Sequence, residues 1–217
     1  MMREVKVWTA LQHSNVVTFH GWAVECSTET DETCAKLVST WCEGGNVTEY
    51  LKHTPNADRR RLVLDAAQGL QYLHAKNVIH GDVKPENIVV NGKGIAMLCD
   101  FGLSCILLDL STYADGSSTA GTARYTAPEV LNGEVQYRDG KSDVWALGCT
   151  SGQILFDLKP YHELETYPAI LRAIMAGHAP FEWNNPDDFL TNINRCLKQN
   201  PSERPTIEEL VLHFNYD

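Results

Sequence analysis

Residues 80–87 read HGDVKPEN, and this stretch brings a carboxylate (Asp82), an amine (Lys84) and an amide (Asn87) into one short turn. A second carboxylate, Asp100, follows two short apolar runs that are separated by an Asn-Gly turn. Carboxylate and amide oxygens are ligands that Mg²⁺ prefers, and a lysine can neutralise a phosphoryl group during its transfer. Together these side chains favour phosphoryl-transfer chemistry.

The stretch at 80–87 resembles the catalytic loop of eukaryotic protein kinases, and later segments match further motifs of that family in the same order. Residues 100–102 read DFG, residues 127–129 read APE, and residues 143–148 read DVWALG. Arg204 lies in the sequence NPSERP, which is similar to the arginine segment near the end of kinase domains. A single motif of this kind is weak evidence, but several in order make a chance match remote. The resemblance covers essentially the whole chain.

The resemblance implies an α+β, protein-kinase-like fold with a truncated β-containing N-lobe and a mainly helical C-lobe. Apolar spacing over 3–11 predicts a short helix, while 16–25 and 36–41 read as the two strands of a hairpin. We assign 1–45 to a residual N-lobe with its regulatory helix, one hairpin and the hinge, and 46–217 to the C-lobe. Further helices are expected at 46–53, 57–76, 139–157, 163–176, 186–198 and 205–213.

Matching the family residue by residue assigns the chemistry to the loop and to Asp100. The resemblance implies that Asp82 accepts the proton of the substrate hydroxyl and that Lys84 contacts the γ-phosphate, so both are predicted catalytic residues. Asn87 and Asp100 are predicted to hold the metal ion, Mg²⁺. A lysine two residues after Asp82 resembles the serine/threonine pattern, and the hinge and loop resemble the tyrosine-kinase-like group of those enzymes.

The resemblance also implies ATP and Mg²⁺ as cofactors. The adenine ring is expected beside the hinge residues Thr40 and Cys42 and above Val89. Around the phosphates and the metal, the predicted cofactor-binding set is completed by Lys84, Asn87 and Asp100. These assignments come from the matched positions alone.

Other matched positions predict packing and not chemistry. Glu129 and Arg204 are expected to form a buried ion pair that anchors the activation segment. His80 is expected to hold the catalytic loop as a core histidine and to take no part in the reaction. The positions that match the stacked regulatory spine of kinases are Trp8, Phe19, His80 and Phe101.

Two features depart from the family pattern. Glu4 matches the glutamate of the regulatory helix, but the chain begins three residues before it, so we expect the family's glycine-rich loop and partner lysine to be missing. Lys6 and Lys36 lack the sequence that surrounds that lysine. Because kinases work by positioning and neutralising the phosphates, this isolated chain is expected to be weakly active or inactive. Gly81 stands where most kinases have an arginine, which removes the cation that reads a phosphate on the activation loop.

Two other functions compete with a protein kinase. The expected absence of the glycine-rich loop favours a pseudokinase scaffold, which binds protein partners without catalysis. The presence of Asp82, Asn87 and Asp100 argues against it, because these are the catalytic and metal-binding positions of the family. Kinases of small molecules, of the aminoglycoside or choline type, share the loop pattern HGDxxxxN. Lys84 and the APE segment make this second alternative the weaker one. We therefore favour a protein serine/threonine kinase.

Composition narrows the partners and the compartment. With 217 residues, 43% of them hydrophobic and 21% charged, the chain suits one ordinary globular domain. A net charge of −10 argues against nucleic acid or an anionic membrane as a partner and favours a basic protein substrate. Seven cysteines without CxxC spacing predict reduced thiols, and no apolar leader or spanning run is found, so we expect a cytosolic or nuclear protein. The oligomeric state follows from none of these features.

Overall fold

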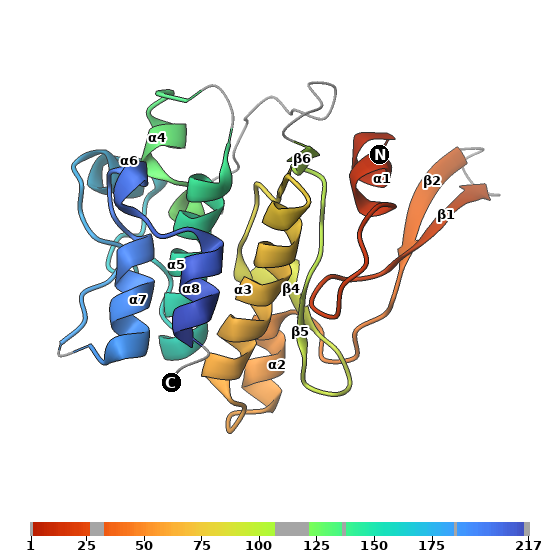
Figure 1. Ribbon diagram of the computed structural model, residues 1–217, viewed down its shortest axis with the longest axis horizontal. Coiled ribbons are helices and arrows are strands. Elements are labelled where there is room, and N and C mark those ends of the chain that lie inside the picture. The colour runs from red at the N-terminus through yellow and green to blue at the C-terminus, as the bar shows by residue number, and fades with distance from the viewer. Residues whose placement is uncertain (1, 27–32, 107–121, 136–137, 185, 215–217) are drawn as a thin grey trace.

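The computed structural model describes residues 2–26, 33–106, 122–135, 138–184 and 186–214. Within these ranges a small N-terminal part, made of one helix and one hairpin, lies beside a larger body that is mainly helical (Figure 1). None of the described helices is long and apolar enough to cross a membrane. The architecture agrees with the predicted α+β fold, in which a small strand-containing part precedes a helical one.

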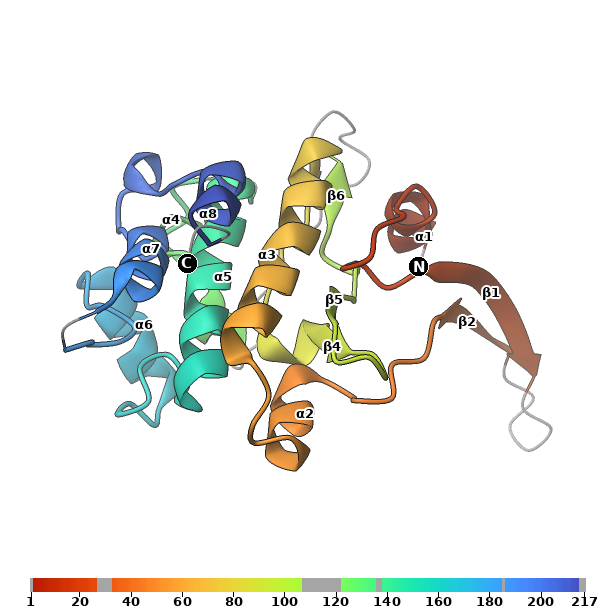
Figure 2. The same ribbon diagram turned by 60° about the horizontal axis from the view of Figure 1, so that its bottom comes forward.

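The N-terminal part is built from α1 (Met2–Trp8) and an antiparallel hairpin of β1 (Phe19–Cys26) and β2 (Thr33–Ser39). The hairpin extends away from the helical body (Figure 2). Trp22 lies opposite Leu37, and residues that lie opposite each other in an antiparallel pair share a face. Leu37 packs against the core, but Trp22 is 61% exposed. The apolar face of the hairpin therefore extends beyond what the core covers.

The chain between α1 and β1 fastens this part to the helical body. The Asn15 side chain donates to the Ala96 carbonyl at 3.0 Å, and the Asn15 carbonyl accepts the Leu98 N–H at 2.9 Å. The Val17 N–H donates to the Leu98 carbonyl at 2.9 Å. Asn15 and Val17 are both buried, so these bonds form in the interior and join the segment after α1 to the strand that contains Leu98.

Two long helices form the centre of the helical body. α3 (Arg59–Ala75) packs against α5 (Gly140–Phe156) and α8 (Ile207–Phe214). Asp139 starts α5 with a capping box, in which its carboxylate accepts the Ser142 N–H and the Ser142 hydroxyl accepts the Asp139 N–H. Buried residues occur on every side of α5, as expected for a helix at the centre of a domain. The remaining α-helices described are α2 (Val47–His53), α4 (Pro128–Leu131), α6 (Tyr167–Met175) and α7 (Asp188–Cys196).

Two small antiparallel sheets hold the segment that follows α3. They pair β3 (Val78–Ile79) with β6 (Cys105–Ile106), and β4 (Ile88–Val90) with β5 (Ala96–Leu98). Residues 80–87 run from the end of β3 to the start of β4, and their last turn is a 3₁₀ helix, Pro85–Asn87. This loop is therefore held at both ends by paired strands, next to the long helices of the body.

Candidate active site

A buried carboxylate on α5 fixes the start of the loop at residues 80–87. Asp143 accepts the backbone N–H groups of His80 at 2.9 Å and of Gly81 at 2.8 Å, and its Oδ2 lies 2.9 Å from the His74 Nε2. Burial raises the pKa of Asp143, but the hydrogen bond and charge of His74 and the N–H of Gly81 outweigh it, so this pKa lies below its usual value. The loop is thus tied to an ionised carboxylate.

His80 holds the loop from within the core, as predicted. Its Nδ1 accepts the Asp82 N–H at 3.2 Å, and its Nε2 lies 3.1 Å from the Cys99 carbonyl oxygen, so the ring proton belongs on Nε2. The predicted stack of rings is confirmed. Neighbouring ring centroids lie 5.1 to 5.4 Å apart in the order Phe19, Trp8, Phe101 and His80.

The loop brings Asp82, Lys84 and Asn87 together. The Lys84 Nζ lies 2.6 Å from the Asp82 Oδ2, and the Asn87 Nδ2 donates to the same oxygen at 2.9 Å and to the Asp82 carbonyl at 2.9 Å. Asp82 is only 9% exposed, and its Oδ1 is buried without a hydrogen-bond partner in the described part of the chain. The protein therefore holds one oxygen of this carboxylate through two side chains.

Asn87 and Asp100 offer oxygen ligands that fit a hard cation. Both Asn87 hydrogen bonds use its Nδ2, which leaves the amide oxygen as an acceptor. The Cys99 N–H donates to the Asn87 carbonyl at 3.0 Å, which brings the chain just before Asp100 beside Asn87. Asp100 is exposed, and its Oδ1 accepts the Gly102 N–H at 3.2 Å. This donor set suits Mg²⁺, which takes carboxylate and amide oxygens.

The described residues hold no cluster of three or more His, Cys, Asp or Glu side chains that could bind a metal ion by themselves. Mg²⁺ commonly binds through one or two protein oxygens together with waters and substrate phosphates. Asn87 and Asp100 therefore fit Mg²⁺ as part of a metal–nucleotide complex and not as a closed protein site.

The predicted ion pair beneath the site is confirmed. Arg204 reaches the α4 residue Glu129 through two parallel bonds, at 2.7 Å to Oε1 and 2.8 Å to Oε2. Both side chains are buried. The Arg204 guanidinium also donates to the Lys198 and Lys141 carbonyls and lies 5.0 Å from the Trp145 ring. All of its donors point into the interior, so the role of this arginine is to hold α4 against the body.

Comparison with known proteins agrees with this geometry. The sequence model of the protein kinase domain matches residues 1–215. The chain belongs to the protein kinase family.

Several curated kinases are similar to this kinase domain. A "Probable serine/threonine-protein kinase" of Dictyostelium discoideum is 30% identical over 213 residues, which cover 97% of this chain and 41% of that protein. A MAP kinase kinase kinase of Schizosaccharomyces pombe is 29% identical over 228 residues, covering 97% of this chain and 16% of that protein. MAP3K epsilon protein kinase 1 of Arabidopsis thaliana is 29% identical over 220 residues, covering 98% and 15%. This kinase domain thus spans less than half the length of these relatives.

The residues predicted to surround adenine lie around one junction of the kinase domain. The Gly44 N–H donates to the Val90 carbonyl and the Val90 N–H donates to the Gly45 carbonyl, both at 2.9 Å, so the hinge lies along β4. Val89 is half-buried on that strand, Cys42 is buried in the core, and Thr40 is exposed. The contacts of Thr40, Cys42 and Val89 with a nucleotide stay a prediction.

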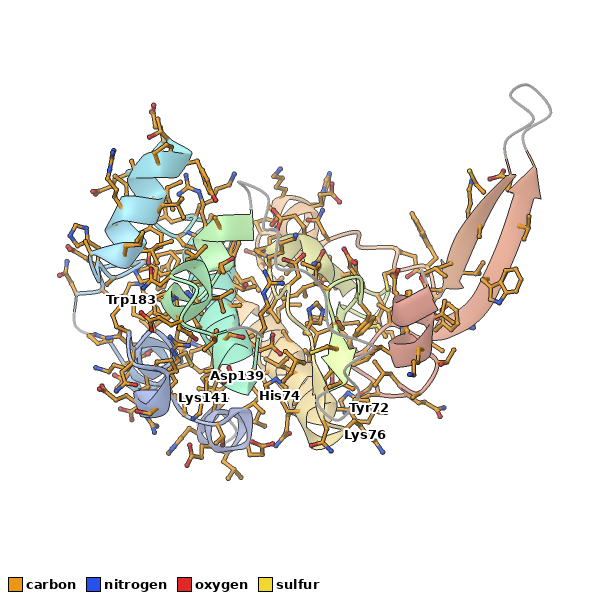
Figure 3. All side chains as sticks on the ribbon, turned by 90° about the horizontal axis from the view of Figure 1, so that it is seen from above. Tyr72, His74, Lys76, Asp139, Lys141 and Trp183 are labelled. Atoms are coloured by element: carbon orange, nitrogen blue, oxygen red, sulfur yellow. The ribbon has the colours of Figure 1, made fainter. Side chains whose placement is uncertain are left out.

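Sequence reasoning missed residues that support the kinase loop from other elements. His74, which bonds to Asp143, lies on α3 beside the start of α5, where Asp139 and Lys141 lie (Figure 3). His74 stands at a position that any polar residue of an amphipathic helix could occupy. The sequence pattern therefore did not distinguish it from other polar residues of the helix. Arg138 was missed for the same reason, because it stands in a polar loop.

Arg138 lies beside Gly81, where the family resemblance had indicated the loss of a cation. A Cβ atom built on Gly81 would lie 3.5 Å from the Arg138 Cδ and 2.8 Å from the Leu103 carbonyl oxygen. Gly81 also has a φ of +80°, which favours glycine. The structure thus supplies a positive charge next to position 81 from a different segment.

Proposed function

We propose that this kinase domain transfers the γ-phosphate of ATP to serine or threonine hydroxyls of proteins. The observation that carries the proposal is the state of Asp82. One of its oxygens is held by Lys84 and Asn87, and the other is buried without a partner in the described part of the chain. A buried acceptor without a donor is costly, and a substrate hydroxyl is the donor that a general base requires.

In this proposal each of the site residues has a distinct role. The substrate hydroxyl donates to the Asp82 Oδ1, which takes its proton as the hydroxyl oxygen attacks the γ-phosphorus. The bond from that phosphorus to the β–γ bridging oxygen breaks, and ADP leaves with the bond's electron pair. Lys84 neutralises charge on the transferred group from the other side of the same carboxylate. Asn87 and Asp100 would hold Mg²⁺, which neutralises the phosphate oxygens of ATP when it is bound. Thr40, Cys42 and Val89 would bind the adenine.

The acidic chain favours basic polypeptides as substrates at long range. A net charge of −10 attracts positively charged proteins and repels nucleic acids and anionic membrane surfaces. We propose a cytosolic or nuclear setting for such substrates, because seven cysteines without metal-binding spacing suit a reducing compartment.

We further propose that residues 1–217 assayed by themselves form a slow enzyme. The resemblance to kinases assigns part of the phosphate binding to a glycine-rich loop and a lysine paired with Glu4, and these 217 residues contain no matching segment. Loss of one preorganised donor to a reacting group costs about 10²–10³ in rate. Long incubations are therefore needed to measure transfer.

A radiometric assay with Mg-ATP and a generic basic protein tests the proposal. Asp82→Asn keeps the shape of the side chain but removes the base, so we expect transfer to fall by about 10²-fold or more. Asp188→Asn, an exposed carboxylate at the start of α7, is the matched control and should leave the rate unchanged. Equal rates for wild type and Asp82→Asn would contradict the assigned base. A wild-type rate no higher than that of buffer would favour the scaffold alternative.

A further inference from the structure

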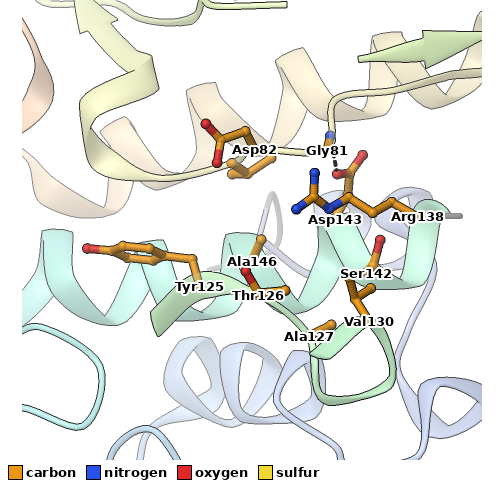
Figure 4. A pocket seen from close by; sticks show the side chains of 11 residues that line it. Gly81, Asp82, Tyr125, Thr126, Ala127, Val130, Arg138, Ser142, Asp143 and Ala146 are labelled. Atoms are coloured by element: carbon orange, nitrogen blue, oxygen red, sulfur yellow. Dashed lines mark hydrogen bonds between the residues drawn. The ribbon is translucent and has the colours of Figure 1, made fainter. Parts of the chain in front are cut away.

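The cavity beside Asp82 is too small to bind a substrate side chain. Its volume is about 20 Å³, and its walls include Gly81, Asp82, Tyr125 and Thr126 (Figure 4). A cavity needs roughly 10–15 Å³ on this measure to hold one water molecule. One water therefore fits there, but a polypeptide gains no binding energy by placing a whole side chain in it.

A much larger cavity lies beside α6, and we call it the α6 cavity. Its volume is about 480 Å³, which is within the range typical of ligand sites. The segments 161–164 and 178–182 line it together with Ala173 of α6. The Tyr161 N–H donates to the Pro180 carbonyl at 2.9 Å, and the Tyr161 hydroxyl donates to the His178 carbonyl at 3.3 Å. These bonds fix the two segments to each other, so the α6 cavity is part of the fold before any ligand arrives.

The lining of the α6 cavity is apolar inside and acidic at the rim. Tyr161, Ala173 and Phe181 are buried and form its inner wall. The exposed lining residues, which form its rim, are His162, Glu163, His178, Ala179 and Glu182. With histidine neutral at pH 7, Glu163 and Glu182 are the charged residues among those that line the cavity. Neither takes part in an ion pair within the ranges that the structure describes.

Arg124 connects the wall of the α6 cavity to the segment beside Asp82. Its guanidinium donates to the Pro160 carbonyl at 2.6 Å, to the Tyr161 carbonyl at 2.9 Å and to the Leu164 carbonyl at 2.7 Å. The next residue, Tyr125, lines the small cavity together with Asp82. One arginine side chain therefore spans from the segment that borders Asp82 to the wall of the α6 cavity. An extended polypeptide covers about 3.3–3.6 Å per residue, so a few residues bridge the two places.

The inner wall and the rim make different demands on a ligand. The buried wall favours a large apolar side chain, because covering apolar surface removes it from water. The two carboxylates favour a cation and oppose phosphates and other anions. A second copy of this chain is a poor occupant, because both copies have a net charge of −10. A basic polypeptide segment with one large apolar residue meets both demands.

We infer that the α6 cavity is a docking site for the protein substrate, and that it takes one large apolar side chain with lysine or arginine beside it. The inference rests on the proposed function, because it takes the ligand to be the protein that presents its hydroxyl to Asp82. The apolar side chain covers Tyr161 and Phe181, while the neighbouring cations pair with Glu163 and Glu182. The docking segment is a few residues away from the acceptor hydroxyl, so this site selects substrates without touching the reacting atoms.

Peptide binding in the absence of ATP tests the site separately from phosphotransfer. Three fluorescent peptides contain no hydroxyl residue and have a central leucine between lysines, a central alanine between lysines, or a central leucine between glutamates. Fluorescence anisotropy gives their dissociation constants for wild type and for Ala179→Trp, which places a large side chain at the rim. Ala176→Trp is the matched control, because Ala176 is exposed at the end of α6 and does not line the cavity.

A second pair of variants tests the charges. Glu163→Gln with Glu182→Gln removes the two rim carboxylates. Glu134→Gln with Glu208→Gln removes the same charge from exposed positions that do not line the α6 cavity. The urea midpoint of each variant checks that it folds, and the charge pair still tests the site if Ala179→Trp does not fold.

We expect wild type to bind the leucine–lysine peptide about tenfold more tightly than the alanine–lysine peptide, and the leucine–glutamate peptide least of all. Ala179→Trp should weaken binding of the leucine–lysine peptide about tenfold, and Ala176→Trp should leave it unchanged. The rim double variant should weaken it about fivefold at low salt and its control should not, because exposed pairs are weak and screened. Equal affinity of wild type for all three peptides, including no binding to any, would overturn the inference. Equal effects of the variants and their controls would also overturn it.

A kinetic measurement tests whether the docked protein is the substrate. A serine peptide is joined to the leucine–lysine segment through glycine linkers of about four, eight and twelve residues, which span increasing distances. In the radiometric assay, at least one joined peptide should show a KM about tenfold lower than that of the serine peptide alone, and Ala179→Trp should remove this gain. If the segment binds but no phosphate is transferred, the proposed function is wrong and the cavity binds a protein partner. If phosphate is transferred but no joined peptide gains in KM, the docking inference is wrong and the proposed function stands.

Discussion

The loop at 80–87 and the β1–β2 hairpin are both short segments next to paired strands, but they differ in what surrounds them. The His80 N–H of the loop at 80–87 donates to Asp143, and the His80 ring accepts the Asp82 N–H; Asp143 and His80 are both buried. The hairpin has an antiparallel ladder with one register shift between Phe19 and Gly21, and it exposes Trp22 and Val24 at 61% and 53%. Two strands alone are marginally stable in water. The two segments therefore differ in burial, although both lie next to paired strands.

Ion pairs in the two regions differ in the same way. Arg204 and Glu129 form two bonds in the interior, beneath the candidate active site. Lys36 and Glu25 pair across the hairpin, where both side chains are 62% exposed. A buried charge that loses its partner is strongly destabilising, whereas exposed pairs contribute little because water screens them. The two pairs therefore test the comparison directly.

The largest effect is expected from Arg204→Met. Removing the guanidinium leaves the Glu129 carboxylate buried without its partner, so the free energy of unfolding should fall by about 3–5 kcal/mol. Lys36→Met, the same substitution on the hairpin, should leave the urea midpoint unchanged. Equal losses in both variants would show that the hairpin pair is also protected from water.

A double variant separates the charge from the packing. In Glu129→Met with Arg204→Met, both charges are gone and the interior is filled with apolar atoms. Part of the lost stability should return, because replacing a buried ion pair by apolar residues is often neutral. A double variant that is less stable than Arg204→Met alone would mean that the carbonyl contacts of Arg204 dominate.

The second effect concerns Asp143, which anchors the loop at 80–87. Its pKa is lowered in the folded chain, so its contribution to stability is present above the unfolded value near 3.9 and is lost as the pH falls through the lower folded value. Asp143→Asn should cost about 1–3 kcal/mol at pH 7, because an amide cannot accept all three bonds. Urea unfolding from pH 7 to pH 3 should show this difference shrinking toward the acid end. A gap between wild type and Asp143→Asn that stays constant with pH, or matches that of Asp188→Asn, would contradict the assignment.

Sequence patterns predicted the elements whose contacts are local. The helical periods at 57–76 and 139–157 correspond to α3 and α5, and the predicted hairpin corresponds to β1 and β2. Short elements were missed, including the two-residue β6 and the one-turn α4, because neither is long enough to show a period.

The sequence predicted those residues of the candidate site that stand in matched motifs. Asp82, Lys84 and Asn87 share one loop, and the structure joins them by hydrogen bonds. His74 and Arg138 were not predicted, since each meets the loop only through the tertiary fold and neither stands in a recognisable pattern. The exposure of the hairpin was also beyond local patterns, because alternation indicates which residues share a face and not whether that face is covered.

The smallest effect on stability is expected for Trp22, in the exposed hairpin. Trp22→Ala removes a large side chain that is 61% exposed, so the free energy of unfolding should change by no more than about 1 kcal/mol. Trp8→Ala is the matched substitution in the interior. Trp8 is buried, its Nε1–H donates to the Val17 carbonyl at 2.6 Å, and its ring packs on Phe101, so this variant should lose about 3–5 kcal/mol.

Urea unfolding at two protein concentrations distinguishes the possible reasons for any deviation. If Trp22→Ala is neutral at both, the apolar face of the hairpin contributes nothing to the fold, as the exposed Trp22 and Val24 indicate. If it is destabilising only at the higher concentration, the face is covered by another copy of the chain, since association stabilises the folded state by mass action. A loss as large as that of Trp8→Ala at both concentrations would mean that the hairpin folds back onto the chain in solution. The contrast between a buried loop at 80–87 and an uncovered hairpin would then be wrong.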